Sequence, residues 1–290
     1  MKGKNIVITG SGRGIGKAIA LACTKEGANV GLISRTLEEL EALKNEIENL
    51  HPQAQVAVKT ADVVKIDEMT ETFNYFKDVL GILDGVIANA GWSRMGNSHE
   101  FDSGQFSAII NINILGVFNT FKAAYPHLKK ENKKEKGRFL ITGSAIYPNL
   151  MPKFAAYGAS KFGVVGLQKE LALEYKGENI TFNMVLPTMV DTRLLRGRKA
   201  GDGNKPDYVM DPSELGGYYV FLLSDEANRI NNQLIQTSDI QKVIAILKQQ
   251  QLEINNGWEA MKSYLQEKAP NEYNKIKGYG KLIEYLINEN

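Results

Sequence analysis

A tyrosine and a lysine that could exchange a proton stand four residues apart, in Tyr157-Gly158-Ala159-Ser160-Lys161. In a helix this spacing places the two side chains on one face. A free phenol has a pKa near ~10 and is a weak base at neutral pH, but a nearby ammonium favours the phenolate and lowers that pKa. The pair could therefore serve as a general acid and base. Such pairs also arise by chance, so this interpretation needs support from other segments.

Four glycines within seven residues form a second candidate site, in Gly10-Ser11-Gly12-Arg13-Gly14-Ile15-Gly16. They follow an apolar segment of strand length and precede a segment of helical period. Glycine lets the backbone approach a pyrophosphate without a Cβ clash, and the amino end of a helix offers free N–H groups and partial positive charge. A flexible turn is the alternative, but four glycines are entropically costly in a merely structural turn. The segment therefore predicts a phosphate-binding loop.

The elements that must position these residues are visible as apolar segments of strand length that alternate with segments of helical period. Strands are expected at 5–9, 29–34, 55–61, 84–88, 138–142 and 180–186, with a last short one at 233–235; helices are expected at about 15–26, 37–50, 66–80, 103–128 and 155–175. Strands that are apolar throughout indicate a sheet covered on both faces. Their alternation with helices predicts an α/β fold with a doubly wound parallel sheet, in which ligands bind at the carboxyl ends of the strands.

The pattern changes towards the end of the chain. From Ser238 onward the sequence is polar, helical in period and rich in Lys, Gln, Asn and Glu. We therefore expect one domain over residues 1–237, and a helical extension over 238–290 that packs on this domain or on a partner subunit.

Composition narrows the classes of function. The chain has 290 residues, 43% hydrophobic and 23% charged, with a formal net charge of +2. Such a charge favours no nucleic-acid partner, and the Lys-rich stretch 129–136 also carries two glutamates, which suits a solvated surface. A single cysteine, Cys23, indicates no disulfide framework, and the histidines are too far apart for a metal site. The apolar run before Gly10 is too short for a signal peptide or a membrane span, so we expect a cytoplasmic protein without metal or transmembrane segment.

Taken together, these motifs resemble the short-chain dehydrogenase/reductase superfamily in its single-domain form of about 250 residues, with a Rossmann fold. The Thr9-Gly-x-x-x-Gly14-Ile-Gly16 spacing carries the resemblance at the start of a match that runs from about Lys4 to Ile235. Ser144 lies 13 residues before the tyrosine, the separation of the family's catalytic serine, whose hydroxyl would bond the substrate oxygen. Asn113 resembles the helix asparagine that holds a water in the proton relay; Asn111 is close by, but the following Gly-x-Phe favours Asn113.

The resemblance also suggests which nicotinamide cofactor is used. A site that prefers NAD usually places an acidic residue at the end of the second strand, where this chain has Ser34-Arg35. A guanidinium there suits the 2′-phosphate of NADP, and Arg13 resembles the second basic position of NADP-binding relatives. NADP is therefore expected rather than NAD, although Arg35 could also be a solvated loop charge.

Further cofactor contacts are implied residue by residue. The family's adenine-contacting aspartate and its neighbour match Asp62 and Val63, and the segment after the fourth strand matches Asn89-Ala90-Gly91. The lysine of the Tyr157–Lys161 pair also binds the nicotinamide ribose in relatives. The segment that closes over the nicotinamide matches Pro187, Thr188, Val190 and Thr192, with Thr188 in place of the usual glycine.

These motifs predict an NADP(H)-dependent oxidoreductase that interconverts a ketone or aldehyde and an alcohol, with Tyr157 as general acid and base. Its partners would be a small carbonyl or alcohol substrate and, as in relatives that pair their two long helices, further copies in a homodimer or homotetramer. Relatives carry a mobile substrate lid in the stretch that matches residues 193–211. Four basic residues in this lid could favour an anionic ketoacyl substrate or could simply be solvated: Arg193, Arg196, Arg198 and Lys199. A dinucleotide-sensing regulator without turnover, or a scaffold whose C-terminal helices recruit a partner, is the alternative function.

Overall fold

The seven predicted strands form one parallel sheet. The computed structural model describes residues 1–128, 136–249 and 257–288, and the strand order is β3-β2-β1-β4-β5-β6-β7. The strands are β1 (Asn5–Thr9), β2 (Asn29–Ser34), β3 (Val56–Thr60), β4 (Gly85–Ala88), β5 (Gly137–Thr142), β6 (Ile180–Leu186) and β7 (Gln233–Gln236). Each predicted strand end agrees with the structure to within one residue, and the predicted doubly wound fold is confirmed.

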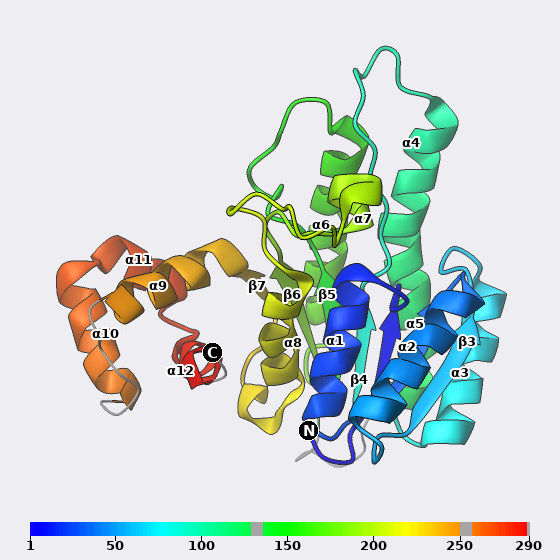
Figure 1. The fold of residues 1–290 in the computed structure, drawn as a ribbon, viewed down its shortest axis with the longest axis horizontal. Coiled ribbons are helices and arrows are strands. Elements are labelled where there is room, and N and C mark those ends of the chain that lie inside the picture. The colour runs from blue at the N-terminus through cyan, green and yellow to red at the C-terminus, as the bar shows by residue number, and fades with distance from the viewer. Residues whose placement is uncertain (129–135, 250–256, 289–290) are drawn as a thin grey trace.

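Helices cover both faces of this sheet (Figure 1). One face carries α1 (Gly14–Lys25), α2 (Leu37–Leu50) and α8 (Gly216–Leu223), and the other carries α3 (Ile66–Leu80), α5 (Gly116–Leu128) and α6 (Ala155–Glu174). Every residue of β4, β5 and β6 is buried. Burial on both faces explains why these strands are apolar throughout instead of alternating. The strand order reverses between β1 and β4, so a crevice opens at the carboxyl ends of these two strands.

Two elements differ from expectation. The helix expected over 103–128 is divided into α4 (Ser103–Ile110), a π-helical turn over Asn111–Leu115, and α5. Helix α8 was not predicted, and seven of its eight residues are buried. A helix that is buried all round has no amphipathic period, so its sequence lacks the signal that identifies surface helices.

The segment from α4 to α5 is long and apolar enough to span a membrane by length and composition, and it is the one such helix among the described residues. Here it packs beside α3 and α6 and carries buried polar side chains on the side that faces the protein. Those polar residues are Asn113, Asn119 and Thr120. The outer faces of α4, α5 and α6 expose Phe106, Phe118 and Phe162, each about 40% exposed.

After β7 the described part of the chain continues into four helices, which lie beyond the β7 edge of the sheet (Figure 1). They are α9 (Thr237–Gln249), α10 (Gly257–Lys268), α11 (Pro270–Ile276) and α12 (Gly280–Asn288). Helix α12 packs against α8, where the rings of Phe221 and Tyr285 lie 5.8 Å apart and a methyl group at Gly217 would lie 2.8 Å from Leu286. The Lys-rich stretch singled out in the sequence falls mostly on residues 129–135, outside the described residues.

Candidate active site

The carboxyl ends of three neighbouring strands are tied together by one amide side chain. Asn89, which follows β4, donates from Nδ2 to the carbonyl oxygens of Thr9 (3.0 Å) and Gly10 (3.2 Å) at the end of β1. Its Oδ1 accepts a hydrogen bond of 3.1 Å from the hydroxyl of Thr142, the last residue of β5. The Thr142 hydroxyl also lies 2.8 Å from the phenol of Tyr219 on the buried helix α8. The floor of the crevice is therefore held at a fixed geometry.

At two positions of the glycine loop, neighbouring backbone atoms lie too close to allow a side chain. Gly10 has a φ of +65°, and a methyl group there would lie 2.9 Å from the Ala90 Cα. A methyl group at Gly16 would lie only 2.3 Å from the Gly10 carbonyl oxygen. Arg13 stands at the N-cap of α1 and cannot cap it, because a guanidinium has no hydrogen-bond acceptor; its side chain pairs with Glu39. The first amides of α1 are therefore not satisfied by the N-cap side chain, as a phosphate site requires.

Tyr157 and Ser144 come together beside this floor. Ser144 follows β5 by two residues, and Tyr157 lies in the first turn of α6. Tyr157 is buried, with 9% of its surface exposed, and its phenol lies beside the Ser144 hydroxyl. Burial raises the pKa of Tyr157, and the interaction with the Ser144 hydroxyl opposes that rise. The sequence predicts that the neighbouring ammonium lowers the pKa of Tyr157. The protein's own groups instead raise this pKa.

Lys161 lies one helical turn further along α6. Its Nζ donates a hydrogen bond of 3.0 Å to the Thr142 carbonyl oxygen and lies 5.5 Å from the centre of the Tyr157 ring. Burial lowers the pKa of Lys161 to about 8. The i,i+4 spacing read in the sequence thus places both groups at the end of β5, in one buried pocket.

The π-helical turn directs Asn113 inwards. Its Oδ1 accepts from the Trp92 backbone N–H (2.8 Å), and its Nδ2 donates to the Trp92 carbonyl oxygen and the Ser160 hydroxyl, each at 2.9 Å. Asn111, by contrast, is exposed, whereas Asn113 is buried. A methyl group at Gly91 would lie 3.4 Å from Asn113 Oδ1 and 4.0 Å from Lys161 Nζ, so these three residues converge on one point.

The residues expected near the adenosine end of a cofactor lie at the ends of β2 and β3. Ser34 ends β2 and Arg35 is exposed just after it. Asp62 accepts a hydrogen bond from the Val64 amide (3.2 Å) and so shapes the turn after β3. The side chain of Val63 is buried against α5, so only its backbone is placed to face a ligand.

The lid segment passes over the glycine loop. The Pro187 carbonyl accepts from the Ala145 amide (2.8 Å), next to Ser144. The Thr188 hydroxyl lies 3.2 Å from the sulfur of Met210, so the residue that replaces the usual glycine joins the two ends of the lid.

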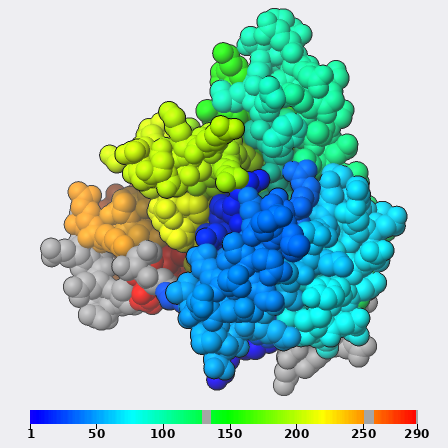
Figure 2. Space-filling view, turned by 45° about the vertical axis from the view of Figure 1, so that its right-hand side comes forward, coloured from blue at the N-terminus to red at the C-terminus, as the bar shows by residue number. Residues whose placement is uncertain are grey.

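Thr192 brings the lid into contact with the glycine loop. Its methyl group would lie 3.1 Å from a Cβ added at Gly14, and its hydroxyl donates to the Val190 carbonyl (3.3 Å). Figure 2 shows the N-terminal segment recessed beneath this lid.

The lid cations are partly neutralised within the chain. The Arg196 guanidinium bonds the carboxylates of Asp191 (2.9 Å) and Asp202 (3.0 Å), and its side chain is 12% exposed. Arg193 lies 3.5 Å from the carboxylate of Glu39. Arg196 therefore holds the lid together and Arg193 connects the lid to α2, which weakens the case for an anionic ketoacyl substrate. Three apolar side chains, those of Met95, Leu150 and Met151, are 59%, 67% and 47% exposed, so they are not core residues.

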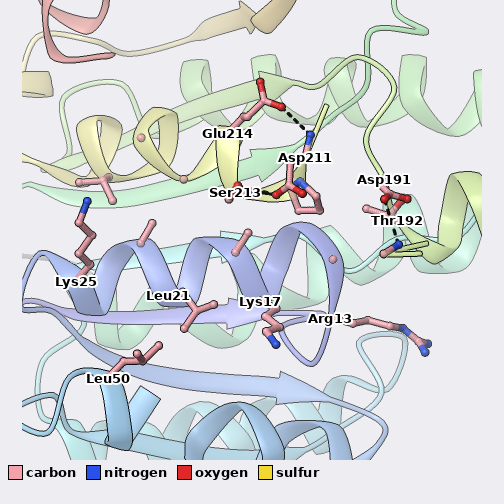
Figure 3. A pocket seen from close by; sticks show the side chains of 18 of the residues that line it. Arg13, Lys17, Leu21, Lys25, Leu50, Asp191, Thr192, Asp211, Ser213 and Glu214 are labelled. Atoms are coloured by element: carbon pink, nitrogen blue, oxygen red, sulfur yellow. Dashed lines mark hydrogen bonds between the residues drawn. The ribbon is translucent and has the colours of Figure 1, made fainter. Parts of the chain in front are cut away.

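A separate groove of about 660 Å³ runs along the outer side of α1, between α8, α12 and the lid. Figure 3 shows Leu21 and Lys17 along its α1 wall, and Arg13 at the amino end of that helix near Thr192. The groove reaches the glycine loop, but neither Ser144 nor the pair on α6 is among the described residues that line it.

Several residues of the site were missed by sequence reasoning. Thr142 was read only as a strand end and Thr9 only as the start of the glycine spacing, although a threonine directly before a glycine at the carboxyl end of a strand could have indicated their hydrogen bonds. Ser160, Tyr219 and Glu39 carry no such local signal, because their partners lie on other elements.

The sequence of this chain is similar to those of known proteins. Residues 4–202 match the family model described as short chain dehydrogenase. The chain is 28% identical over 242 residues to a 3alpha-hydroxysteroid dehydrogenase of Mediterraneibacter gnavus, an alignment that covers 81% of this chain and 95% of that protein.

Two solved structures share the fold. An alcohol dehydrogenase from the archaeon Thermococcus sibiricus, in complex with 5-hydroxy-NADP, superposes with a TM-score of 0.72 at 28% identity and covers 80% of this chain and 95% of its own. A 3-ketoacyl-(acyl-carrier-protein) reductase from Brucella melitensis, in complex with NADH, superposes with a TM-score of 0.73 at 26% identity and covers 81% and 96%.

Proposed function

The chain belongs to the short-chain dehydrogenase family and is an oxidoreductase that interconverts alcohol and carbonyl groups with a nicotinamide cofactor; we propose that this cofactor is NADP(H) and that Tyr157 is the general acid and base. The residues present fit a dinucleotide. The glycine loop leaves no room for side chains at Gly10 or Gly16, and the backbone N–H groups at the amino end of α1 face the place where a pyrophosphate would lie.

The cofactor, when bound, supplies or accepts the hydride at its nicotinamide ring. In the reductive direction, the Tyr157 hydroxyl donates its proton to the substrate oxygen, while the Ser144 hydroxyl donates a hydrogen bond to the same oxygen and stabilises its developing charge. Lys161 holds positive charge close to the phenol and would bind the nicotinamide ribose. Gly91 and Asn113 form the side of the crevice next to Lys161.

The observation that carries this proposal is the convergence of three groups: the Tyr157 phenol is buried beside the Ser144 hydroxyl, and Lys161 Nζ lies 5.5 Å from the centre of the same phenol ring. Burial keeps the phenol protonated, which is the form required to reduce a carbonyl. A dinucleotide-sensing regulator would need none of these three groups, so their convergence favours turnover.

NADP(H) is preferred over NAD(H) because two arginines, Arg13 and Arg35, lie by the glycine loop and the end of β2. A guanidinium matches the geometry of a phosphate, and no acidic residue directly follows β2. Relatives in complex with an NADP derivative and with NADH are both known, so the preference rests on these residues of this chain.

Replacement of Tyr157 by Phe tests the proposal. We expect turnover to fall by about 10²- to 10⁴-fold, the usual contribution of a general acid, with the affinity for the dinucleotide nearly unchanged. Rates are measured against a panel of ketones and alcohols with NADPH and NADH in parallel, and dinucleotide affinity is measured by fluorescence titration. Tyr75→Phe, on the solvent side of α3, is the matched control. Full activity of Tyr157→Phe would end the proposed role of the phenol.

A further inference from the structure

A carboxylate lies between two arginines at the mouth of the glycine loop. Glu39, in the first turn of α2, has its Oε1 2.9 Å from Arg13 Nη1 and 3.5 Å from Arg193 Nη1. The Glu39 side chain is 25% exposed, whereas those of Arg13 and Arg193 are 52% and 63% exposed. This arrangement, which we call the Glu39 bridge, connects the loop, α2 and the lid.

The same carboxylate leans over the glycine loop. A methyl group at Gly12 would lie 2.9 Å from the Glu39 Cβ, 3.0 Å from its Oε2 and 3.4 Å from the Ser34 hydroxyl. Gly12 and Ser34 belong to the two segments between which a doubly wound sheet holds the adenosine ribose of a dinucleotide. The sequence places no acid directly after β2, but the fold brings Glu39 to that position from five residues further along.

We propose that Glu39 is a specificity-determining residue that limits the affinity of this site for a 2′-phosphorylated ribose. This inference rests on the proposed use of NADP(H). A 2′-phosphate carries up to two negative charges, so it is repelled by the Glu39 carboxylate and competes with it for the Arg13 guanidinium. Both effects weaken the binding of the 2′-phosphate. The protein therefore binds the phosphorylated ribose more weakly than its arginines alone would allow.

Glu38 provides a contrast within the same helical turn. It carries the same charge on the same element, but its side chain is exposed and it is not one of the groups in contact with the Gly12 position. Replacement of Glu38 by Gln therefore removes an equal charge from α2 without removing the carboxylate between the arginines. The comparison separates a local effect from a change in net charge.

The test uses nucleotide fragments, so that its readout does not depend on turnover. The dissociation constants of 2′,5′-ADP and 5′-AMP are measured by calorimetry for the wild-type protein, Glu39→Gln and Glu38→Gln. We expect Glu39→Gln to bind 2′,5′-ADP roughly tenfold more tightly, with a change below about threefold for 5′-AMP, because only the former carries the repelled phosphate. Glu38→Gln should resemble the wild type. The gain should shrink at high ionic strength, where charge interactions are screened.

The outcomes separate the two proposals. If the wild type binds 2′,5′-ADP and Glu39→Gln binds it equally or less tightly, the role of Glu39 is overturned and the use of NADP(H) stands. If neither protein binds either nucleotide, both proposals are overturned. Glutamine keeps the size of the side chain and an oxygen for Arg13, and loss of a half-exposed ion pair costs little stability, so the variant should fold. Glu39→Ala, with a thermal melt of each protein, guards against a local change in the loop.

Discussion

At the scale of single residues, burial shifts the pKa values of the two proton-handling groups in opposite directions. It raises the pKa of Tyr157 and lowers that of Lys161 to about 8. The cause is the same for both groups, since a low-polarity environment disfavours the charged form of each. The neutral phenol is therefore the resting form in the protein itself, and the ammonium can release its proton near the working range of pH.

The lowered pKa of Lys161 predicts a pH dependence of stability. The native protein loses this proton at about 8, whereas the unfolded chain keeps it until about 10.5. Because the unfolded state binds more protons in this window, the contribution of Lys161 to the free energy of unfolding rises with pH from about 8 to about 10.5. The total rise is about 3 kcal/mol for a shift of this size.

Lys161→Met removes this titration. Urea unfolding of the wild type and the variant should give free energies whose difference grows with pH across the window, in favour of the wild type. Lys169→Met, on an exposed position of α6, should follow the wild type. Parallel curves for the wild type and Lys161→Met would contradict the assigned shift.

At the scale of elements, the site depends on the close approach of the loops that follow β1, β4 and β5. Asn89 bonds the end of β1 and the end of β5, and Thr142 continues the contact to Tyr219 on α8. Helix α8 thus supports the crevice from beneath the sheet. Any side chain that pushes the glycine loop away from Asn89 should disturb both the phosphate loop and the strand ends.

Gly16→Ala tests this close packing. A methyl group there would lie 2.3 Å from the Gly10 carbonyl oxygen and 2.7 Å from Asn89 Nδ2, and the backbone cannot yield without moving the loop. We expect a loss of about 2 kcal/mol in the free energy of unfolding, together with loss of dinucleotide binding.

Gly166→Ala, within α6, is the matched comparison, because none of the described residues places an atom within 4 Å of the added methyl group. This variant should be about 0.5–1 kcal/mol more stable, since alanine is the better helix former. Chemical unfolding and fluorescence titration of both variants measure these effects. Unchanged stability and binding in Gly16→Ala would refute the described packing.

At the scale of the whole molecule, the C-terminal helices share a buried apolar cluster with the sheet-covering helices. Leu282 and Ile283 of α12 are fully buried, in the cluster that also contains α8. The extension therefore packs in this structure as part of the same core. We expect it to unfold together with the rest of the chain and not as a separate tail.

Leu282→Ala measures this coupling. Removal of a fully buried leucine side chain should cost about 2–5 kcal/mol, and the melting temperature of the whole protein should fall in a single transition. Leu50→Ala, on a position of α2 that is 59% exposed, should change stability little. A separate low-temperature transition in calorimetry, with the main one unmoved, would show instead that residues 238–290 fold independently.

The sequence by itself determined the sheet, the glycine loop and the Tyr157–Lys161 pair. Strands buried on both faces must be apolar throughout, a phosphate loop needs glycine, and an i,i+4 spacing on one helix is a local property. Each of these signals lies within a short segment, so it can be read without knowledge of the fold.

Only the tertiary structure decided the rest. Glu39 looks like one more charge on the polar helix α2, and its position between Arg13 and Arg193 depends on residues 26 and 154 positions away. Arg196 similarly looks like a free lid cation until the lid folds around it. Side-chain partners across elements are set by how the helices and loops pack on the sheet, and no local pattern in the chain encodes that packing.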